Sequence, residues 1–481
     1  MNLFEAIFRH DASSTAIAFE QRTMSYGALR TETLKMARVI RSLGVAPGDR
    51  VALLLHDSPE FITAFIAICS LGAIAVPINM SLRAEEQSSI LENCGARLVL
   101  REGETFTEPQ APNTSWPGFP EPGPNDPAFI LYTSGSTGEP KGAVHRQSDI
   151  FYTNETFCRE VLQLTPKDRL FSSSRLPFAY GLGNSFSFPL LNGATTILCR
   201  EKPSPDIIAR IFKQHRPTIF FGVPVIYNLL LEYRRKSGDL DASSLRLCVS
   251  AGEALPAHLG EEWERKFGVQ LLDGIGSTEM LHMFISNHEN EVRYGSSGRL
   301  LHGYEAQLRD EHGNRVPSGT EGNLWIKGDS AAIGYWEKPE ATGKTFVDGW
   351  VQTGDLYRCD SEGYWFHMGR SDDCFKSSGQ WISPVEVEGT LLRHPEVARA
   401  AVVEDFDADQ LPCACAFVVK QEVESNAGKL EHELRKLAAE SLPRFKQPRK
   451  YVFVTELPYT ATGKVQRFKL RQRLRTASGA V

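Results

Sequence analysis

Hydrophobic residues in the first hundred positions of the chain alternate between two spacings. Apolar residues of segment 26–40 recur at helical intervals, whereas residues 50–55 are apolar at every position after Arg50, which is typical of a buried strand. The succession continues with a helix over 59–71, a strand over 73–77, a helix through 90–91 and a strand over 96–100. Strands that alternate with helices predict a parallel sheet covered on both faces, and therefore an α/β fold.

The alternation returns between residues 150 and 300, after a proline-rich stretch (102–127) that we interpret as an exposed connection. It predicts a helix over 223–233 and strands over 195–198, 218–221, 246–250 and 269–272. Ligands of such sheets bind where strands end, so the loops after these strands are candidate binding positions.

Short strands separated by turns replace this pattern from residue 292 to 369, which predicts a β-barrel-like subdomain. A polar break at 369–373 follows. The remaining residues include an alternating stretch at 385–388 and a helix over 429–441, and they predict a second, smaller α+β domain. The expected organisation is a large N-terminal domain of parallel α/β sheets plus the barrel-like subdomain (1–369), a hinge (370–375) and a small mobile C-terminal domain (376–481).

The composition is that of an ordinary globular protein. Hydrophobic residues make up 41% and charged residues 23% of the chain, and the net charge is −6. A chain of 481 residues exceeds the size of a single core, which agrees with the expected division. Nucleic-acid-binding proteins carry a basic excess, so the negative charge argues against a nucleic-acid partner.

The nine cysteines are scattered along the chain, mostly in apolar runs. Their odd number and their spacing favour buried free thiols in a reducing compartment over disulfides or a zinc site.

The N-terminal residues show no basic segment before a long apolar one, so we expect no signal peptide. The apolar stretch 61–76 is interrupted at Gly72 and is shorter than the ~18 residues that a membrane span needs. We therefore expect a cytoplasmic protein without membrane association.

Residues 132–142 read YTSGSTGEPKG and follow a predicted strand at 128–132. Their glycines allow a sharp turn and close approach of the backbone, while the hydroxyls, free amides and Lys141 suit a polyphosphate. A solvated Ser/Gly linker is the alternative, although a linker rarely lies between two strands. Lys141 is followed by Gly142 rather than by Ser or Thr, so the loop differs from the Walker loop.

Three further stretches carry candidate chemistry. Residues 273–279 (DGIGSTE) combine a carboxylate and a hydroxyl on a glycine-flanked turn, which can hold Mg²⁺ against phosphate oxygens. Asp355, in the stretch 353–355, can accept both hydroxyls of a ribose. Lys464 lies in the stretch 462–464 near the C-terminus. Taken singly, each of the last two stretches is more typical of a solvated turn.

Taken together and in order, these stretches resemble a known family. The loop at 132–142, GSTE at 276–279, TGD at 353–355, GRSD at 369–372 and TGK at 462–464 resemble the ordered motifs of the adenylate-forming superfamily. That group contains acyl- and aryl-CoA synthetases, adenylation domains of peptide synthetases and luciferases. The resemblance covers nearly the whole chain, and five motifs in one order make it specific.

Three more stretches make the chain most similar to the benzoate-CoA ligase branch. They are FAYGLGN at 178–184, SAGEALP at 250–256 and GSTEMLH at 276–282. The resemblance implies a reaction in two halves. A carboxylate attacks the α-phosphate of Mg-ATP to give an acyl adenylate and pyrophosphate, and the thiol of coenzyme A then displaces AMP. ATP and Mg²⁺ are therefore the implied cofactors, with coenzyme A as a substrate.

The resemblance also implies roles for single residues. Those implied in catalysis are Lys464, Glu279 and Thr278, with Glu279 also holding Mg²⁺. Those implied in ATP and AMP binding are Thr133, Ser134, Gly135, Ser136, Thr137, Lys141, Asp273, Gly274, Ile275, Asp355 and Arg370. Many relatives carry an aromatic residue where this chain has Ile275, so the expected adenine pocket departs from the family pattern there.

A pocket for the aromatic substrate is implied in the same way. Its residues are Ala179, Tyr180, Ala251, Gly252, Glu253, Gly276 and His282. Small residues, Gly274 among them, leave a flat slot that Tyr180 can close, which suits a single aromatic ring better than a flexible acyl chain. We expect His282 to hydrogen-bond or charge-pair with a carboxylate or an ortho substituent; a core histidine is the alternative. Benzoate is the leading substrate, followed by 2-aminobenzoate (anthranilate) and hydroxybenzoates.

The second half-reaction requires Lys464 to withdraw. The family achieves this by rotating its C-terminal domain about one hinge residue, which maps to Asp372. The rotation is expected to present Lys376, Ser378 and Gly379 to the thiol; for residues 376–380 a plain hairpin turn is the alternative.

The acceptor of the aryl group is the main open question. The basic residues Arg444, Lys446, Arg449 and Lys450 favour coenzyme A, although a solvated charge run is equally ordinary. An acyl carrier protein is the alternative acceptor, and a catalytically silent nucleotide-binding protein is a third hypothesis. The sequence leaves the oligomeric state open, with a homodimer among the expected states.

Overall fold

The computed structural model describes residues 2–104, 118–134, 140–317, 319–377, 380–407, 411–421, 426–459 and 465–478. The chain divides into two compact units. The first consists of Met1–Leu255, Leu259–Glu305 and Ile326–Gln352, and the second of Pro256–His258, Ala306–Trp325 and Thr353–Val481. The predicted boundaries at residues 370 and 375 stay a prediction.

A nine-stranded sheet in the first unit has the order β14-β13-β12-β11-β10-β8-β9-β1-β2. Its strands are β1 Thr15–Phe19, β2 Arg22–Ser25, β8 Arg169–Ser172, β9 Thr195–Leu198, β10 Ile219–Gly222, β11 Leu247–Ser250, β12 Leu271–Gly276, β13 Met283–Ser286 and β14 Arg299–Leu300. The strands from β12 through β1 are parallel, as the sequence predicts, and both ends of the sheet are antiparallel.

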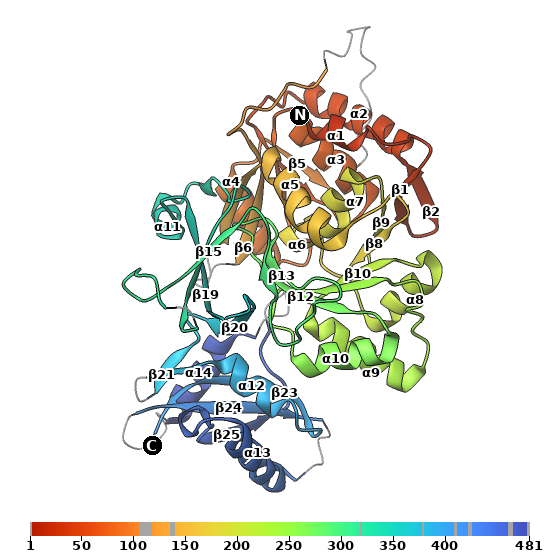
Figure 1. The fold of residues 1–481 in the computed structure, drawn as a ribbon. Coiled ribbons are helices and arrows are strands. Elements are labelled where there is room, and N and C mark those ends of the chain that lie inside the picture. The colour runs from red at the N-terminus through yellow and green to blue at the C-terminus, as the bar shows by residue number, and fades with distance from the viewer. Residues whose placement is uncertain are drawn as a thin grey trace. The chain divides into compact units, whose positions relative to one another are not determined.

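Three amphipathic helices cover this sheet beside β10 and β12 (Figure 1). They are α8 Pro205–His215, α9 Pro224–Ser237 and α10 Ala257–Phe267. Their buried side chains, including Phe212, Tyr227 and Trp263, pack against Phe220 of β10 in one hydrophobic cluster. Burying such large aromatic side chains stabilises this layer.

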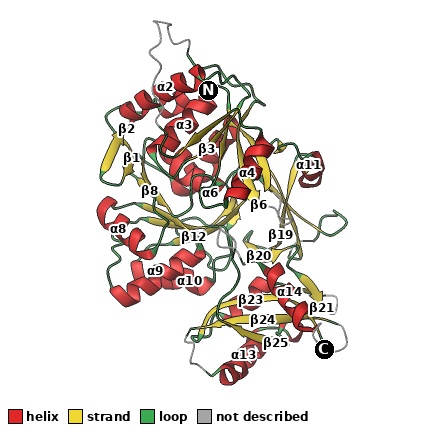
Figure 2. Cartoon of the chain, turned by 180° about the vertical axis from the view of Figure 1, so that it is seen from behind, coloured by secondary structure: helices red, strands yellow, loops and turns green. Residues whose placement is uncertain are grey.

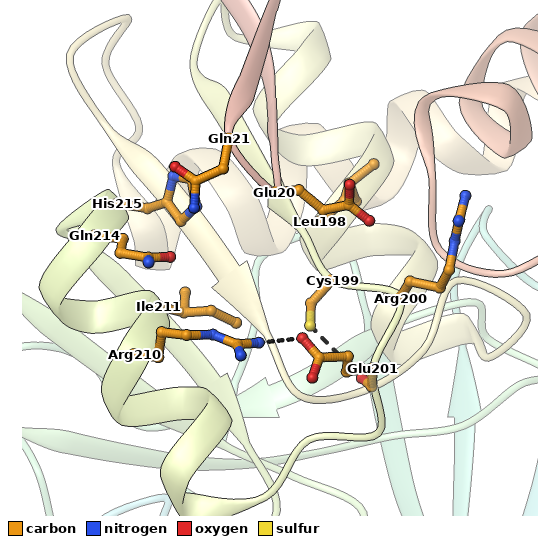
Figure 3. A pocket seen from close by; sticks show the side chains of 10 residues that line it. All are labelled: Glu20, Gln21, Leu198, Cys199, Arg200, Glu201, Arg210, Ile211, Gln214 and His215. Atoms are coloured by element: carbon orange, nitrogen blue, oxygen red, sulfur yellow. Dashed lines mark hydrogen bonds and ion pairs between the residues drawn. The ribbon is translucent and has the colours of Figure 1, made fainter.

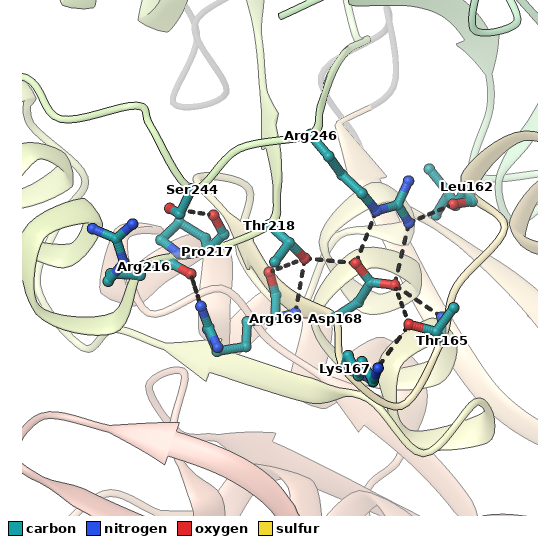
Figure 4. Close-up of polar contacts among 10 residues, drawn as sticks. All are labelled: Leu162, Thr165, Lys167, Asp168, Arg169, Arg216, Pro217, Thr218, Ser244 and Arg246. Carbon is teal, nitrogen blue, oxygen red and sulfur yellow. Dashed lines mark hydrogen bonds and ion pairs between the residues drawn. The ribbon is translucent and has the colours of Figure 1, made fainter.

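A buried carboxylate joins three strands of the same sheet at their N-terminal ends (Figure 4). Asp168 lies just before β8. It accepts a hydrogen bond from Nε of Arg246, just before β11, at 2.9 Å, and another from Oγ1 of Thr218, just before β10, at 2.7 Å. The amide of Thr165 also donates to it at 2.9 Å. Burial alone would raise the pKa of Asp168, but the hydrogen bonds from these three partners outweigh it and lower the pKa below its ordinary value.

A six-stranded sheet with the order β17-β7-β6-β4-β3-β5 forms the other layer of the first unit. Its strands are β3 Arg50–Leu54, β4 Ile74–Pro77, β5 Leu98–Arg101, β6 Pro127–Ser134, β7 Pro140–Arg146 and β17 Gly334–Tyr335. The neighbouring helices are α1 Leu3–Ile7, α2 Tyr26–Ser42, α3 Pro59–Ser70, α4 Ala84–Cys94 and α5 Gln147–Thr153. Helix α3 is buried on all sides, which explains why its sequence is the most apolar of the chain.

Several short helical segments of the first unit contain or surround the stretch 178–184, which is implied in binding the aromatic substrate. It contains η1 Asn154–Leu162, α6 Ala179–Leu182, η2 Gly183–Ser187 and α7 Phe188–Leu191. Segments η1 and η2 have π-helical hydrogen bonding, a local widening that often occurs at functional sites.

A set of further strands follows, as the sequence predicts, and β19 is antiparallel to both β18 and β20. They are β15 Glu305–Arg309, β16 Glu321–Lys327, β18 Phe346–Val347, β19 Trp350–Cys359 and β20 Trp365–Arg370, with helix α11 Pro339–Thr345 between them. Strand β20 pairs with β19 in the five-stranded sheet β15-β16-β19-β18.

The last part of the chain is an α+β layer (Figure 2). Its elements are β21 Phe375–Ser377, β22 Gln380–Ile382, α12 Pro384–Leu391, β23 Val397–Phe406, β24 Pro412–Lys420, α13 Ala427–Ser441, η3 Arg444–Lys446, β25 Lys450–Val454 and α14 Arg467–Ser478. Helices α12 and α13 pack on one face of the sheet β23-β24-β25, and α14 packs on the other.

Two local features differ from the sequence-based expectation. Residues 273–276 are not a turn but the end of β12, in which Asp273 pairs with β11 and residues 274–276 pair with β13. The alternating stretch 385–388 lies in helix α12, which begins with a Ser383 cap and Pro384 at its first position. These helix-start signals outweigh the alternation of side chains.

Candidate active site

The glycine-rich loop joins two antiparallel strands. Tyr132 pairs with Gly142, and Thr133 pairs with Lys141, across β6 and β7. A Cβ on Gly142 would lie 2.6 Å from Ile130 Cγ2, so only glycine fits at this position. Gly135, Ser136 and Thr137 lie outside the described residues, as does the side chain of Ser134. The described part therefore fixes the two ends of the loop and the position of Lys141.

The backbone of the Thr278–Glu279 turn is held against this hairpin. The carbonyl oxygen of Thr278 accepts a hydrogen bond from His145 Nε2 of β7 at 2.8 Å. The carbonyl oxygen of Glu279 accepts one from the amide of Ala332, also at 2.8 Å. His145 is itself fully buried, and its Nδ1 lies 3.0 Å from Asp149 Oδ2. The structure thus brings the predicted phosphate loop and the predicted metal ligand together.

The side chain of Glu279 is held as well. Tyr335 donates its hydroxyl hydrogen to Glu279 Oε1 at 2.6 Å. The Lys141 ammonium lies 5.5 Å from the centre of the same tyrosine ring. Tyr335, His145 and Ala332 are far from Glu279 in the sequence, and none of them lies in one of the motifs quoted above.

The environment of Glu279 fits a nucleotide-bound Mg²⁺. No described residue donates a hydrogen bond to Oε2 of Glu279, so this oxygen is available to a hard cation. Within the described ranges, no three His, Cys, Asp or Glu side chains gather into a metal site. A magnesium ion held here would therefore take its remaining ligands from phosphate oxygens and water, which is usual for Mg²⁺ bound with a nucleotide.

The predicted adenine segment is a buried strand end. Asp273 is only 4% exposed, and burial raises the pKa of its carboxyl group well above the ordinary value. Its Oδ1 has no hydrogen-bond partner among the described residues. A buried acceptor of this kind is suited to an amino group of a ligand. Ile275, two residues further on, is partly exposed and available for packing against a flat base.

The two glycines of this strand serve the pairing of β12 with β13. A Cβ on Gly274 would lie 2.8 Å from the carbonyl oxygen of Ile285, and one on Gly276 would lie 2.4 Å from that of His282. The space beside Gly274 is thus filled by protein. It does not widen the expected slot for an aromatic ring, which corrects that part of the sequence interpretation.

Tyr180 and His282, two of the residues expected to bind the aromatic substrate, are neighbours in the structure. Their ring centres are 5.6 Å apart, and Tyr180 donates its hydroxyl hydrogen to the carbonyl oxygen of Val249 at 3.0 Å. Ala179, which precedes Tyr180, and Ala251 are buried. Gly252 is exposed and has a φ of 92°. The anchored tyrosine gives the region one rigid aromatic wall.

His282 is enclosed by aromatic rings and is uncharged near neutral pH. Its ring centre lies 4.6 Å from that of Phe188 and 4.8 Å from that of Phe157. Burial lowers the pKa of His282 to about 3, which disfavours the charge pairing considered from the sequence. Asn184 Oδ1 lies 3.2 Å from its Nε2, and Nδ1 has no described partner. Hydrogen bonding to a ligand stays a prediction.

The two predicted ribose residues are cross-strand neighbours. Asp355 of β19 pairs with Arg370 of β20, and Arg370 Nη1 donates to Asp355 Oδ1 at 3.2 Å. His367 Nε2 lies 3.4 Å from the same carboxylate oxygen, a neighbour that the sequence did not indicate. Asp355 is 8% exposed, so its carboxylate is held in place by the two strands.

The residues expected to act in thioester formation are only partly described. Lys376 pairs with Glu311 and lies 4.7 Å from the ring centre of Trp381. Strands β21 and β22 are antiparallel, and Lys376 pairs with Trp381. Asp372 is exposed. Ser378, Gly379 and Lys464 lie outside the described residues, so their roles stay predictions.

The basic run 444–450 is largely neutralised by acidic partners. Lys446 pairs with Glu386 at 2.6 Å, Arg449 with Asp407 at 2.5 Å and Lys450 with Asp405 at 3.3 Å. These charges are therefore weaker support for binding a phosphorylated acceptor than the sequence suggested.

A pocket of about 400 Å³ is lined by other residues of the chain (Figure 3). It is lined by residues 20–21, by the segment after β9 and by one face of α8. Arg210 and Glu201, which face it, form an ion pair with each other. None of the predicted site residues lines this pocket.

The comparisons with known proteins define the class first. Residues 4–336 match the AMP-binding enzyme family, and residues 386–464 match the AMP-binding enzyme C-terminal domain. The chain belongs to the AMP-binding enzyme family, the adenylate-forming enzymes. Within the described residues, no helix combines the length and the apolar character needed to cross a membrane.

The relatives then place the chain in the benzoate-CoA ligase branch. It is 39% identical to a benzoate–CoA ligase of Thauera aromatica over 93% of this chain and 90% of that protein. A crystal structure of an anthranilate CoA ligase in complex with anthranoyl-AMP has a TM-score of 0.93 and 36% identity, with 100% of this chain and 98% of that chain covered. A benzoate CoA ligase from Burkholderia xenovorans LB400 has a TM-score of 0.89 and 38% identity, with 98% and 100% covered.

Proposed function

We propose that this protein is an ATP-dependent aryl-CoA ligase that activates benzoate or a simple substituted benzoate such as anthranilate. The carboxylate displaces pyrophosphate from ATP to give an aryl adenylate, and coenzyme A then displaces AMP to give the aryl-CoA thioester. The observation that carries the proposal is the fixed position of Glu279 beside the β6–β7 hairpin. Attack by an anion on a polyphosphate requires positioned cations. This arrangement provides two, the ammonium group of Lys141 and a Mg²⁺ ion held by Glu279.

Lys141 and Glu279 have different roles in binding the phosphates of ATP. The hairpin residues Thr133 and Lys141 bind the polyphosphate, and Glu279 holds Mg²⁺ through a carboxylate oxygen. When bound, the ion stabilises negative charge on the phosphate oxygens. Lys464 supplies positive charge near the reacting carboxylate, a role that rests on its motif.

The nucleoside is bound by two separate groups of residues. Asp355 accepts hydrogen bonds from the ribose hydroxyls, and Arg370 orients that carboxylate from the neighbouring strand. The buried carboxyl group of Asp273 and the side chain of Ile275 receive the adenine.

The aryl pocket supports a single aromatic ring. Tyr180 is anchored to the sheet by its hydroxyl group, and His282 is a neutral hydrogen-bonding group with aromatic neighbours. A neutral, aromatic environment accepts a flat ring and offers only a few directional contacts to its substituents.

Pyrophosphate release with Mg-ATP tests the proposal across a panel of acids. The panel is benzoate, 2-aminobenzoate, hydroxybenzoates, phenylacetate, cinnamate and hexanoate, each with and without coenzyme A. The proposal predicts sustained release only with single-ring benzoates and only with coenzyme A. Release that stops after about one equivalent until a carrier protein is added would favour the carrier protein as acceptor. No release with any acid would contradict an enzymatic function.

Cellular location and assembly follow as further parts of the proposal. All nine cysteines are free, and most are buried, as in proteins of a reducing compartment. We therefore place the enzyme in the cytoplasm, with aromatic acid, ATP and coenzyme A as its small-molecule partners. A homodimer stays a prediction.

A further inference from the structure

Tyr335 makes a short hydrogen bond to the predicted metal ligand. Its hydroxyl donates to Glu279 Oε1 at 2.6 Å, a distance typical of a charge-assisted bond to a carboxylate. The tyrosine is 8% exposed and lies on β17, where it pairs with Ala143 of β7. The hydroxyl group therefore has a fixed position relative to the hairpin that carries Lys141.

The tyrosine is fixed independently of Glu279. Its amide donates to Thr342 Oγ1 at 2.9 Å, and the amide of the next residue, Trp336, donates to the carbonyl oxygen of Gly142 at 2.7 Å. The Lys141 ammonium lies over its ring. Because the backbone on both sides of the ring is bonded, the hydroxyl orients the carboxylate rather than following it.

The hydrogen bond makes the two carboxylate oxygens of Glu279 different from each other. Oε1 is occupied by Tyr335, whereas Oε2 has no donor among the described residues. The hydrogen bond uses one lone pair of Oε1 and holds the carboxylate in one orientation, which favours coordination of a cation through Oε2 over coordination through both oxygens. Mg²⁺ requires near-octahedral geometry with single oxygen ligands, whereas the larger Ca²⁺ also accepts both oxygens of one carboxylate.

We propose that Tyr335 is a positioning residue that restricts Glu279 to one-oxygen coordination and thereby favours Mg²⁺ over larger divalent cations at the nucleotide. The inference rests on the proposed role of Glu279 in holding the ion. It adds a residue and a cation preference that the motifs do not assign.

The test measures binding of a non-hydrolysable ATP analogue by calorimetry, in Mg²⁺ and in Ca²⁺, without an aromatic acid. For Tyr335→Phe we expect the ratio of Mg²⁺-supported to Ca²⁺-supported affinity to fall about tenfold, because a charge-assisted hydrogen bond is lost and Oε1 is released. The matched control is Tyr304→Phe, which removes another buried hydroxyl, bonded to Ser330 Oγ at 2.9 Å. The control should keep the wild-type ratio.

Glu279→Gln and the double variant separate a positioning role from a structural one. Once the carboxylate is gone, removal of the Tyr335 hydroxyl should not change the ratio further, so the two effects should be non-additive. An unchanged ratio in Tyr335→Phe, or full additivity in the double variant, would overturn the inference while pyrophosphate release still reports the proposed function. An unchanged ratio in Glu279→Gln would overturn both the metal role of Glu279 and the inference. Thermal unfolding of each variant verifies that it is folded.

Discussion

His145 and Thr278 are joined by a hydrogen bond of 2.8 Å between the imidazole Nε2 and the main-chain carbonyl oxygen. The bond connects β7, which follows the phosphate loop, to the turn that carries the predicted metal ligand, 133 residues further along the chain. The imidazole is fully buried, and Asp149 holds its other nitrogen. Two motifs that the sequence places far apart are thus fixed to each other by side chains outside both motifs.

Replacing His145 by Asn should therefore impair the first half-reaction. We expect kcat/KM for ATP–pyrophosphate exchange to fall about 10- to 100-fold, the usual cost of removing a group that orients a metal ligand. His432, exposed on α13, provides the control, since His432→Asn should leave the exchange rate unchanged. Exchange at the wild-type rate in His145→Asn would show that the turn is held without this bond.

Asp355→Asn should weaken nucleotide binding selectively. The substitution removes the negative charge that faces Arg370 and replaces one of the two carboxylate oxygens proposed to accept from the ribose hydroxyls with an NH2 donor. We expect the KM for ATP to rise about tenfold or more and the KM for the aromatic acid to change little, because hydrogen bonds to a charged group carry ~1.5–3 kcal/mol. Steady-state kinetics with each substrate varied in turn give both constants. Equal increases in the two KM values would contradict a ribose-specific role.

Asp168 should make stability fall in acid. Its pKa is lowered in the folded state, so its hydrogen bonds contribute to stability fully above the ordinary pKa of an aspartate. The contribution is lost as the pH falls through the lower folded pKa, because protonation removes the charge that Arg246 and Thr218 face. Asp168→Asn should lower the free energy of unfolding at pH 7 and reduce its dependence on pH below about 4. Denaturant titrations at several pH values test this, and an unchanged acid slope would contradict it.

Asp57 should have the opposite effect on the pH dependence. Burial raises the pKa of this carboxyl group to about 6, even though Arg175 lies 3.6 Å away. The folded state then holds a proton that the unfolded state releases, so stability decreases as the pH rises from about 4 to 6. Asp57→Asn should remove this decrease, whereas Asp239→Asn at an exposed loop position should not. A wild-type slope in Asp57→Asn would show that another group titrates there.

The fold could be predicted well where one physical signal dominates. Strand β10 is buried along its whole length and β3 at every residue after its first, and a strand buried on both faces has a largely apolar sequence. The sequence predicts a turn at Gly274, where the structure has a strand end. A glycine is needed here because a Cβ would collide with a carbonyl oxygen, but the sequence does not distinguish this need from that of a turn. Only the position of Ile285 distinguishes the two cases.

The candidate site was predictable where its residues lie within ordered motifs. Glu279, Asp355 and Lys141 could be named because each lies in such a motif. Tyr335 could not, because its hydroxyl acts on a residue 56 positions earlier in the chain and no local pattern marks it. His282 was placed in the right region, but its charge state depends on burial among aromatic rings that are distant in the sequence.

The most direct test of the proposed reaction follows an isotope from the acid to the nucleotide. The enzyme is incubated with benzoate labelled with ¹⁸O in both carboxylate oxygens, together with Mg-ATP and coenzyme A, and the products are analysed by mass spectrometry. Attack on the α-phosphate followed by thiolysis predicts one ¹⁸O in AMP, none in pyrophosphate and one in benzoyl-CoA. Label in inorganic phosphate with formation of ADP, or AMP without label, would contradict the account.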